Sequence, residues 1–353
     1  MMKKIIFFVC LAPFLMQCRS AKITPNSVAS VQEQGCITCF AEGLGGGKTT
    51  CEASAIVYDG SKLLIANDKD MPDGRTSVFY YKGNKLSGDT TGRIYLQNPI
   101  FKQGKKYEDF ALAPNGLVFL TTAFDRKKDN STEWDAYNTI LYWQKGSEEQ
   151  PRVLSYETGA QTSILLRDKI AKVLADEEFK EKMPYFKIEG IAATNTHLYL
   201  GVRETGKSFQ NPTYLVKIIE VPYSVVNNEV KLGEMAVICD FKPQIDKLPL
   251  GLSSIEYDPT NHVFIIITSY ESGENFGAYL WIASLEDLKS SRIRPLKNSD
   301  NTQLFIKSKV EDIAIVGKNT YYLIHDDDRV KTTIGNKTRQ LNQAIYTVVH
   351  IKN

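Results

Sequence analysis

The sequence has few of the residues that several common enzyme classes require. Histidine occurs only four times in 353 residues, at His197, His262, His325 and His350. The Gly-x-Ser-x-Gly elbow that presents the nucleophile of α/β-hydrolases is absent. A serine-type catalytic triad therefore has few candidates for its base.

An excess of charge of either sign is also missing. The 43 basic and 41 acidic residues leave a net charge of +2 and are spread along the whole chain. Binding of nucleic acid depends on clustered Lys and Arg that neutralise phosphates, so we expect no nucleic acid partner. A hydrophobic content of 42% is sufficient for a folded core.

The N-terminal apolar run, from Ile5 to Met16, is too short to span a bilayer. It follows two lysines, which is the layout of a secretory signal peptide. The next residues, Leu15 to Cys18, resemble the lipobox of bacterial lipoproteins, with Gln17 where a small residue is usual. We predict a signal peptide over residues 1–17, and a lipid anchor (including palmitate) at Cys18 that attaches the protein to a membrane.

The expected location is the outer membrane, because Arg19 follows the lipidated cysteine where the inner-membrane retention signal would have Asp. The alternative is an ordinary signal peptide that is cleaved nearby. The protein would then be periplasmic or secreted, and Cys18 would be an incidental thiol.

Cysteine is scarce as well, with six in the chain. Removal of Cys10 with the signal and assignment of Cys18 to lipid leave an even number: Cys36, Cys39, Cys51 and Cys239. In an exported protein this favours one or two disulfides, one of which would tie the N-terminal arm to the folded body. Free thiols, or a redox or zinc role for Cys36-Ile-Thr-Cys39, are the alternatives, although no second Cys-x-x-Cys is present.

Residues 18–50 are polar and rich in Ser, Gly and Thr, which predicts a lipidated tether. Within this segment, Gly43 to Thr49 has some likeness to a phosphate-binding P-loop. The motif needs Gly five positions before its Gly-Lys pair, where this chain has Glu42, and it needs a preceding hydrophobic strand. We therefore expect no nucleotide.

A degenerate repeat indicates the fold class. Four segments open with Glu-x-x-Ala, and the segment from Ser253 to Glu256 aligns with them. Each start is followed by a polar turn and a second apolar run, which predicts a hairpin. Further β-branched runs supply a third and a fourth strand, and four strands per unit are typical of a propeller blade. We predict an all-β protein whose residues 51–353 form a β-propeller, with five blades preferred and six possible.

Two irregularities refine this prediction. Residues from about 160 to 185 have helical periodicity and many Lys, Glu and Ala, so we expect one inserted amphipathic helix. The last repeat, from Glu311 to Asn353, has no obvious fourth strand. We expect an early segment to supply this strand and close the ring. A β-sandwich, the alternative architecture, explains neither the repeat nor its spacing.

Two hairpins carry a resemblance to a known group. The first hairpin starts with Ile188 to Ala192, and its second strand ends with Gly201 to Glu204. The other hairpin combines Val310 to Ala314 with Ile324 to Asp328. These resemble phytase-like, or esterase-like, β-propellers and their exported relatives, diffusely over residues 52 to about 350. The resemblance implies a propeller and a metal-dependent phosphoesterase or esterase activity. No complete catalytic set can be transferred from it.

The residues that open the first strands are expected to converge, because first strands line the central channel of a propeller. We expect a ring of Glu52, Glu108, Glu189 and Glu311. Crowded carboxylates suit calcium, with Asp326 and Asp328 as further ligands. Alternatively, each Glu accepts hydrogen bonds from backbone N–H groups of the neighbouring blade and only latches the ring, which the regular recurrence favours.

The ends of the second strands break the symmetry and are better candidates for function. The predicted ligand-binding residues are Asp68, Asp70, Asp125, Arg126, Arg203, Glu204 and Arg329. Arginine there could clamp a carboxylate or phosphate with two hydrogen bonds. Weaker candidates for catalysis are His325, Arg203 and Asp326. The tryptophans, Trp134, Trp143 and Trp281, are expected to pack between blades rather than form a surface that stacks on sugars.

The sequence thus predicts an exported propeller that binds a small anionic or hydroxylated ligand or a protein partner. In one hypothesis, bound calcium stabilises the propeller. A metal-dependent phosphoesterase is the alternative. Whether the protein is an enzyme is left open.

Overall fold

The computed structural model describes residues 23–24, 26–86, 92–128, 131–245, 248–273, 275–327 and 331–352. The predicted signal peptide (residues 1–17) and Cys18 lie outside the described residues, as do Asp328 and Arg329. In the described ranges, no helix is both long and apolar enough to cross a membrane.

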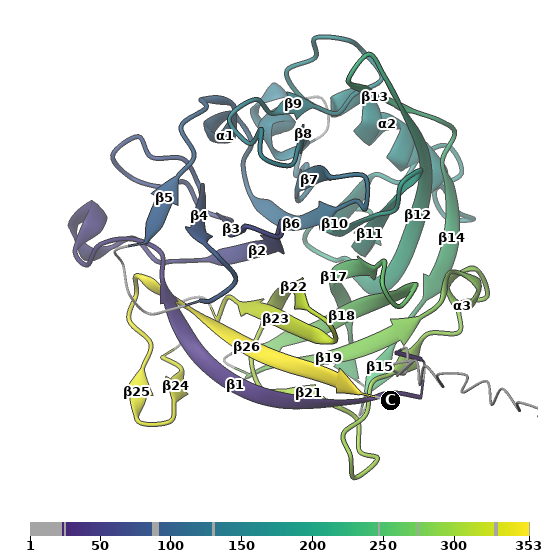
Figure 1. The fold of residues 1–353 in the computed structure, drawn as a ribbon. Coiled ribbons are helices and arrows are strands. Elements are labelled where there is room, and N and C mark those ends of the chain that lie inside the picture. The colour runs from purple at the N-terminus through teal and green to yellow at the C-terminus, as the bar shows by residue number, and fades with distance from the viewer. Residues whose placement is uncertain are drawn as a thin grey trace, which may run out of the picture.

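Five antiparallel sheets surround a central axis as the blades of a β-propeller, which confirms the predicted fold class and the preferred blade number (Figure 1). Blade 1 consists of β2 (Ala53–Tyr58), β3 (Lys62–Asn67), β4 (Val78–Lys82) and β5 (Arg93–Tyr95). Blade 2 consists of β6 (Tyr107–Leu112), β7 (Leu117–Thr122), β8 (Ile140–Gln144) and β9 (Arg152–Val153). Blade 3 consists of β10 (Tyr185–Ala193), β11 (His197–Gly206), β12 (Thr213–Val226), β13 (Glu229–Leu232) and β14 (Ala236–Phe241).

Blade 4 consists of β17 (Gly251–Asp258), β18 (Val263–Ser272), β19 (Asn275–Ala283), β20 (Arg294–Pro295) and β21 (Phe305–Ile306). Blade 5 consists of β22 (Val310–Gly317), β23 (Thr320–His325), β26 (Gln343–Lys352) and β1 (Val28–Thr38). The loops add two short hairpins, β15 (Gln244–Ile245) with β16 (Leu248–Pro249) and β24 (Thr333–Ile334) with β25 (Lys337–Thr338). They also contain α1 (Ile100–Gln103), α2 (Ile164–Val173), α3 (Leu285–Lys289) and the 3-10 helices η1 (Leu44–Gly47) and η2 (Thr132–Tyr137).

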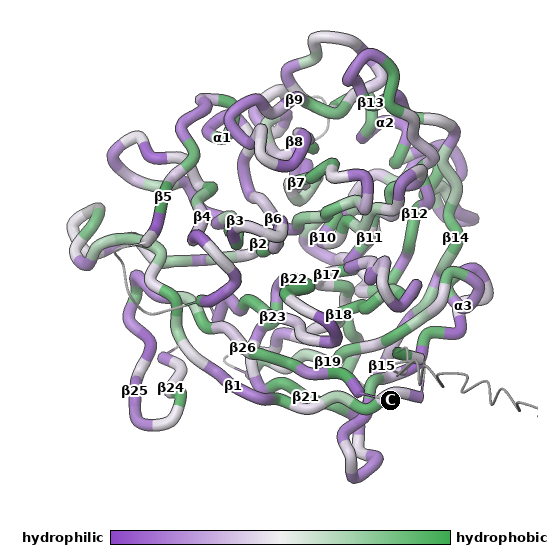
Figure 2. Tube along the Cα trace, viewed as in Figure 1, coloured by the Kyte–Doolittle hydropathy of each residue, from purple (hydrophilic) through white to green (hydrophobic). Residues whose placement is uncertain are grey.

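The inner strands of each blade are buried on both faces, and this explains their continuous apolar runs. In β3, Leu63 and Ile65 pack in a core shared with blade 5, whereas Leu64 and Ala66 pack in a core shared with blade 2. Successive residues of a strand point to opposite faces, so a strand between two neighbours needs apolar side chains at every position. Figure 2 shows the hydrophobic residues concentrated on the strands and the hydrophilic ones in the connecting loops.

The ring closes through a strand from the start of the chain. Strand β1 pairs antiparallel with β26 and forms the outer edge of blade 5, as expected for the missing fourth strand (Figure 1). The prediction of a tether over residues 18–50 is therefore wrong for Val28–Thr38. This strand is exposed along its middle, and its polar sequence hid it; Ala29 and Ile37 near its two ends are buried.

A disulfide follows this closing strand. Cys39, directly after β1, is bonded to Cys51, just before β2, which confirms a disulfide between the N-terminal arm and the folded body. Cys36 and Cys239 are free thiols. The bond therefore covalently links the strand that closes blade 5 to the strand that begins blade 1.

The predicted helical insertion is confirmed but shorter than expected. Helix α2 ends at Val173, after Leu166 and Ile170 have packed into the core between blades 2 and 3. Asp176 then accepts hydrogen bonds from the backbone N–H groups of Glu178 and Phe179, at 3.0 and 2.8 Å. A side chain that bonds its own backbone in this way competes with a continuing helix.

Candidate functional site

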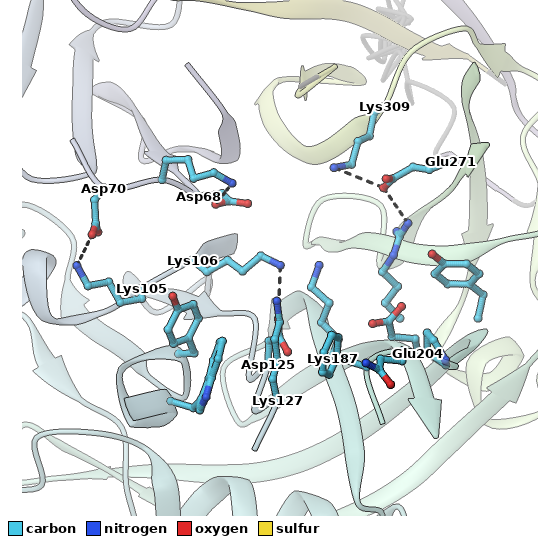
Figure 3. Close-up of a pocket in the computed structure, with 18 residues that line it drawn as sticks. Asp68, Asp70, Lys105, Lys106, Asp125, Lys127, Lys187, Glu204, Glu271 and Lys309 are labelled. Carbon is cyan, nitrogen blue, oxygen red and sulfur yellow. Dashed lines mark hydrogen bonds and ion pairs between the residues drawn. The ribbon is translucent and has the colours of Figure 1, made fainter. Parts of the chain in front are cut away.

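A cavity of about 780 Å³ lies where the first strands begin and the second strands end, and all five blades contribute to it. Figure 3 shows the labelled side chains converging on this one space. Its cations are Lys69, Lys105, Lys106, Lys127, Lys187, Arg203 and Lys309. Its carboxylates are Asp68, Asp70, Asp125, Glu204 and Glu271. Its aromatic residues are Trp134, Tyr137, Phe209 and Tyr214, and Gln210 and Pro212 complete the lining.

The four glutamates predicted to form a ring are buried next to the lysines of this cavity. In three blades a lysine stands two residues before the glutamate, at Lys106, Lys187 and Lys309. Lys309 lies 2.9 Å from Glu311, and Lys187 pairs with Glu189 and lies 3.4 Å from Glu108. In blade 1, Lys69 comes from the loop after the second strand, β3, and lies 2.7 Å from Glu52.

These pairs do not fit the predicted calcium site. Each of the four carboxylates, Glu52, Glu108, Glu189 and Glu311, already has an ammonium neighbour. Among the residues that the structure describes, no group of three or more His, Cys, Asp or Glu is placed to hold a metal ion. Asp326 is buried after β23, where its N–H donates to the carbonyl of Lys309, and it does not line the cavity.

The glutamates do not act as the predicted latch either. The latch to neighbouring blades is made by the residues that directly follow two of them, Asp109 and Asp312. Asp109 accepts a hydrogen bond from Ile191 N–H of blade 3 at 2.9 Å, and Asp312 accepts one from Ile56 N–H of blade 1 at 2.6 Å. The latch is therefore displaced by one residue from its predicted position.

Burial and pairing together set the protonation of the glutamates. Burial and the nearby Glu189 raise the pKa of Glu108 to about 8, against the opposing effect of Lys187 and Lys106. Burial also raises the pKa of Glu311 to about 7. For Glu189, the effect of burial is outweighed by Lys187 and Arg203, which lower its pKa to about 2. At neutral pH the floor of the cavity therefore carries less negative charge than four carboxylates would give.

Blade 4 breaks the pattern, because it has Gly251 and Ser253 where three other blades have lysine and glutamate. Arg203, from β11 of blade 3, fills the space. Its Nη1 donates to the carbonyl of Leu252 and to the hydroxyls of Ser253 and Ser269, each at 3.1 Å. A Cβ atom at position 251 would lie 2.8 Å from Cγ of Arg203, so glycine is needed there.

Aromatic residues line one side of the cavity. Trp134 and Tyr137 come from η2, and Phe209 comes from the loop between β11 and β12. The ammonium of Lys127 lies 5.4 Å from the ring of Trp134 and 5.3 Å from that of Phe209, within the range of cation–π attraction. The prediction that all three tryptophans pack between blades holds for Trp143 and Trp281, which are buried, and is wrong for Trp134.

Two backbone positions beside the cavity have a strained conformation. Lys106 and Phe124 have φ angles of 62° and 53°, a region that few residues other than glycine and asparagine adopt. The two segments are joined by a hydrogen bond from Ala123 N–H to the carbonyl of Lys106 at 2.9 Å. Strain of this kind is often retained where it orients functional side chains, and here it positions Lys106 and Asp125.

Five of the seven predicted ligand-binding residues lie together around the cavity: Asp68, Asp70, Asp125, Arg203 and Glu204. Arg126 does not line it and instead pairs with Asp135 at 3.1 Å. His325 is also absent from the lining; it is 1% exposed and neither ring nitrogen has a hydrogen-bond partner. Burial lowers the pKa of His325 to about 4, so the imidazole is neutral at neutral pH. Because it is buried outside the cavity lining, a ligand in the cavity does not reach it.

The residues that sequence reasoning missed are mainly the lysines. Three of them could have been found from the Lys-x-Glu spacing, which recurs in the same blades as Glu-x-x-Ala. Lys127, Trp134 and Phe209 lie in loops with no repeated pattern, and the sequence contains no signal that would place them at the cavity.

Comparison with known proteins does not assign the chain to a family. No family model matches it, and no curated protein matches it. An α-L-arabinofuranosidase from Podospora anserina is similar in structure, with a TM-score of 0.44 and 10% identity over 94% of this chain and 98% of that chain. A family 117 glycoside hydrolase from Zobellia galactanivorans has a TM-score of 0.43 and 9% identity, over 93% and 91%.

A putative glycoside hydrolase from Parabacteroides distasonis has a TM-score of 0.40 and 11% identity, over 94% of each chain. Likeness at this level carries no argument about function. The five sheets of this chain confirm the propeller that the resemblance to phytase-like proteins implied, whereas membership of that family is not shown.

Proposed function

We propose that the protein binds a hydroxylated, carbohydrate-like ligand in the cavity at the end of the propeller axis. The observation that carries this proposal is the lining itself, in which seven cations and five carboxylates surround one space that has aromatic rings on one side. The volume of about 780 Å³ lies within the range of small-molecule sites, roughly 300–1,000 Å³.

A saccharide suits this lining because each hydroxyl group can donate one hydrogen bond and accept others. Such a group can bridge an ammonium and a carboxylate, for example at the pair of Lys105 and Asp70, which lie 2.5 Å apart. The aromatic rings, Trp134 and Phe209 among them, would cover the apolar C–H face of a sugar ring.

We propose binding rather than hydrolysis because each carboxylate among the described residues of the cavity has a cation or a hydroxyl donor beside it. Glycoside hydrolysis uses two carboxyl groups that flank the scissile bond, one of which acts as an acid. Here Asp70, Asp125 and Glu271 have lysine or arginine neighbours, as does Asp68. Glu204 accepts a hydrogen bond from the hydroxyl of Tyr185 at 2.7 Å.

We also propose that the protein is exported and anchored to the outer membrane through Cys18. The signal-like pattern of residues 1–17 and the resemblance of Leu15 to Cys18 to a lipobox support this. The propeller would then be held at the membrane surface with its cavity accessible to soluble saccharides.

The test of the binding function is a glycan array probed with the full chain carrying Cys18→Ser, exported without lipid. We expect binding to a subset of saccharides and a loss of about tenfold or more in affinity for Phe209→Ala. Phe305→Ala is a matched control, because Phe305 on β21 is 41% exposed, Phe209 is 40% exposed, and Phe305 does not line the cavity.

Two outcomes would overturn the proposal. One is the absence of binding to any saccharide by protein whose circular dichroism shows a folded β-structure. The other is binding that Phe209→Ala and Trp134→Ala leave unchanged. Turnover of aryl glycosides by the same sample, abolished by a substitution in the cavity, would replace binding with hydrolysis as its function.

A further inference from the structure

One carboxylate of the cavity bridges two cations that come from different blades. Oε1 of Glu271, from β18, lies 3.4 Å from Nη2 of Arg203 and 3.4 Å from Nζ of Lys309. Figure 3 shows Glu271 and Lys309 joined across one side of the cavity. The two cations thus hold one oxygen of a carboxylate between them.

Glu271 is held more loosely than the two cations. Charge-assisted hydrogen bonds between nitrogen and oxygen are usually about 2.7–2.9 Å long, and both contacts of Glu271 are longer. Its side chain is 35% exposed, whereas the side chains of Arg203 and Lys309 are 4% and 16% exposed. A partly exposed carboxylate at such distances can leave without disturbing the fold.

The two cations would stay in place if Glu271 left. The other guanidinium nitrogen of Arg203 is fixed by Leu252, Ser253 and Ser269, and the guanidinium lies 5.2 Å from the ring of Tyr214. Lys309 remains 2.9 Å from Glu311. The pair is therefore organised in advance for a negative group that enters from the cavity.

We propose that Arg203 and Lys309 form a subsite for the carboxylate of an acidic saccharide, and that this carboxylate displaces Glu271. The inference rests on the proposed function and specifies its ligand as a saccharide that contains a uronic acid. The bound carboxylate would replace that of Glu271 between the same two cations, and its sugar ring would lie against Tyr214, which also lines the cavity.

The experiment compares matched sugars on the same full-length protein carrying Cys18→Ser. Dissociation constants are measured by ligand-observed NMR for glucuronate and galacturonate, each against its neutral parent sugar. We expect at least one uronate to bind about tenfold more tightly than its parent, as a charge-assisted hydrogen-bonded contact predicts. Lys309→Met should remove this preference.

Glu271→Gln is a second variant, and it changes a partly exposed side chain rather than a buried one. Because it removes the competing negative charge, we expect uronate affinity to rise severalfold while affinity for the neutral sugar changes little. Glu286→Gln is the control, since Glu286 on α3 is an exposed carboxylate that lies beside Arg292, outside the cavity.

The two proposals fail in different ways. Equal affinity for uronates and neutral sugars, with no effect of Glu271→Gln, would overturn the carboxylate subsite and leave saccharide binding intact. Binding of sulfated or phosphorylated sugars without uronate binding would also overturn it. Absence of binding to any sugar would overturn the proposed function itself.

Discussion

Asp109 and Asp312 lie carboxyl to carboxyl where the five blades meet, within hydrogen-bonding reach of each other. Their other partners come from the first strands of all five blades: Ile56, Phe110, Ile191, Ser254, Ile255 and Ile313. Two carboxyl groups in contact need a proton between them, and burial raises the pKa of both. That of Asp312 rises to about 6, and that of Asp109 rises well above its ordinary range, with Asp312 and Glu256 adding to the effect.

This pair makes the stability of the propeller depend on pH. The folded protein keeps a proton on Asp109 at pH values where the unfolded chain has lost it, above about pH 4. The free energy of unfolding therefore falls as the pH rises from about 4, until the folded-state pKa is passed. Asp109→Asn keeps a donor for Asp312 and an acceptor for Ile191 N–H, and it removes this titration.

We therefore expect Asp109→Asn to gain stability relative to wild type as the pH rises, by more than about 1 kcal/mol between pH 5 and pH 8. Urea unfolding at each pH measures the difference, in which the contributions of the buried carboxyl groups away from this pair cancel. Asp109→Ala, which also removes the acceptor, should lose about 2–4 kcal/mol at pH 5, and less at pH 8 because it removes the same titration. A pH-independent difference between the Asn variant and wild type would show that the pair does not share a proton.

The contact between Arg203 and Gly251 predicts that substitutions at these two positions have coupled effects on stability. A methyl group at position 251 would lie 2.8 Å from Cγ of Arg203 and 2.9 Å from Cδ1 of Tyr214. We expect Gly251→Ala to cost about 1–3 kcal/mol in thermal or urea unfolding, and less when Arg203 is already alanine. The control is Gly317→Ala, because its Cβ would meet nothing closer than 3.8 Å. Additive costs would mean that Arg203 does not fill the space at position 251.

The disulfide between Cys39 and Cys51 predicts that its removal lowers the free energy of unfolding of the propeller. It spans 12 residues of sequence, and loss of a bond that closes a loop of this size costs about 3 kcal/mol. We expect Cys39→Ser with Cys51→Ser to lower the free energy of unfolding by about that amount, and reducing agent to do the same to wild type. Cys36→Ser, at a free thiol, is the control and should change little.

The proposed lipid anchor at Cys18 predicts a difference in membrane partition. Wild-type protein expressed in a bacterium should incorporate labelled palmitate and enter the detergent phase of a phase-separating detergent. Cys18→Ser should do neither, whereas Cys10→Ser, inside the proposed signal peptide, should behave as wild type. Retention of Cys18→Ser in the detergent phase would argue against lipidation at this residue.

The repeat could be predicted because Glu-x-x-Ala recurs within the chain at the first hairpin of four of the five blades. The ends of the second strands could be predicted for the same reason, which is why Asp68, Asp125 and Glu204 were correctly placed near one another. The repeat and the strand ends can both be read from residues that are close together in the sequence.

What could not be predicted depends on contacts between blades. Arg203 occupies the space beside Gly251 of the next blade, and nothing near either residue in the sequence indicates this. The middle of β1 is exposed because the strand lies at the outer edge of blade 5, so its composition matches that of a tether. His325 follows the pattern of an acidic turn, but it belongs to the buried end of β23.

The buried glutamates predict how binding of an acidic saccharide responds to pH. The pKa of Glu311 is raised to about 7 and that of Glu108 to about 8, mainly by burial, so both lose their protons as the pH rises from 6 to 9. Two negative charges then appear beside Lys309 and Lys187, which weakens attraction for an anionic ligand.

We expect the affinity for the preferred uronate to fall severalfold over this range, while affinity for its neutral parent sugar changes much less. Glu108→Gln should remove the part of the fall centred near pH 8, and Glu311→Gln the part centred near pH 7. Titration calorimetry at pH 6, 7, 8 and 9 measures each contribution. An unchanged profile in both variants would mean that neither glutamate changes its protonation between pH 6 and pH 9, and it would overturn this explanation of the pH dependence.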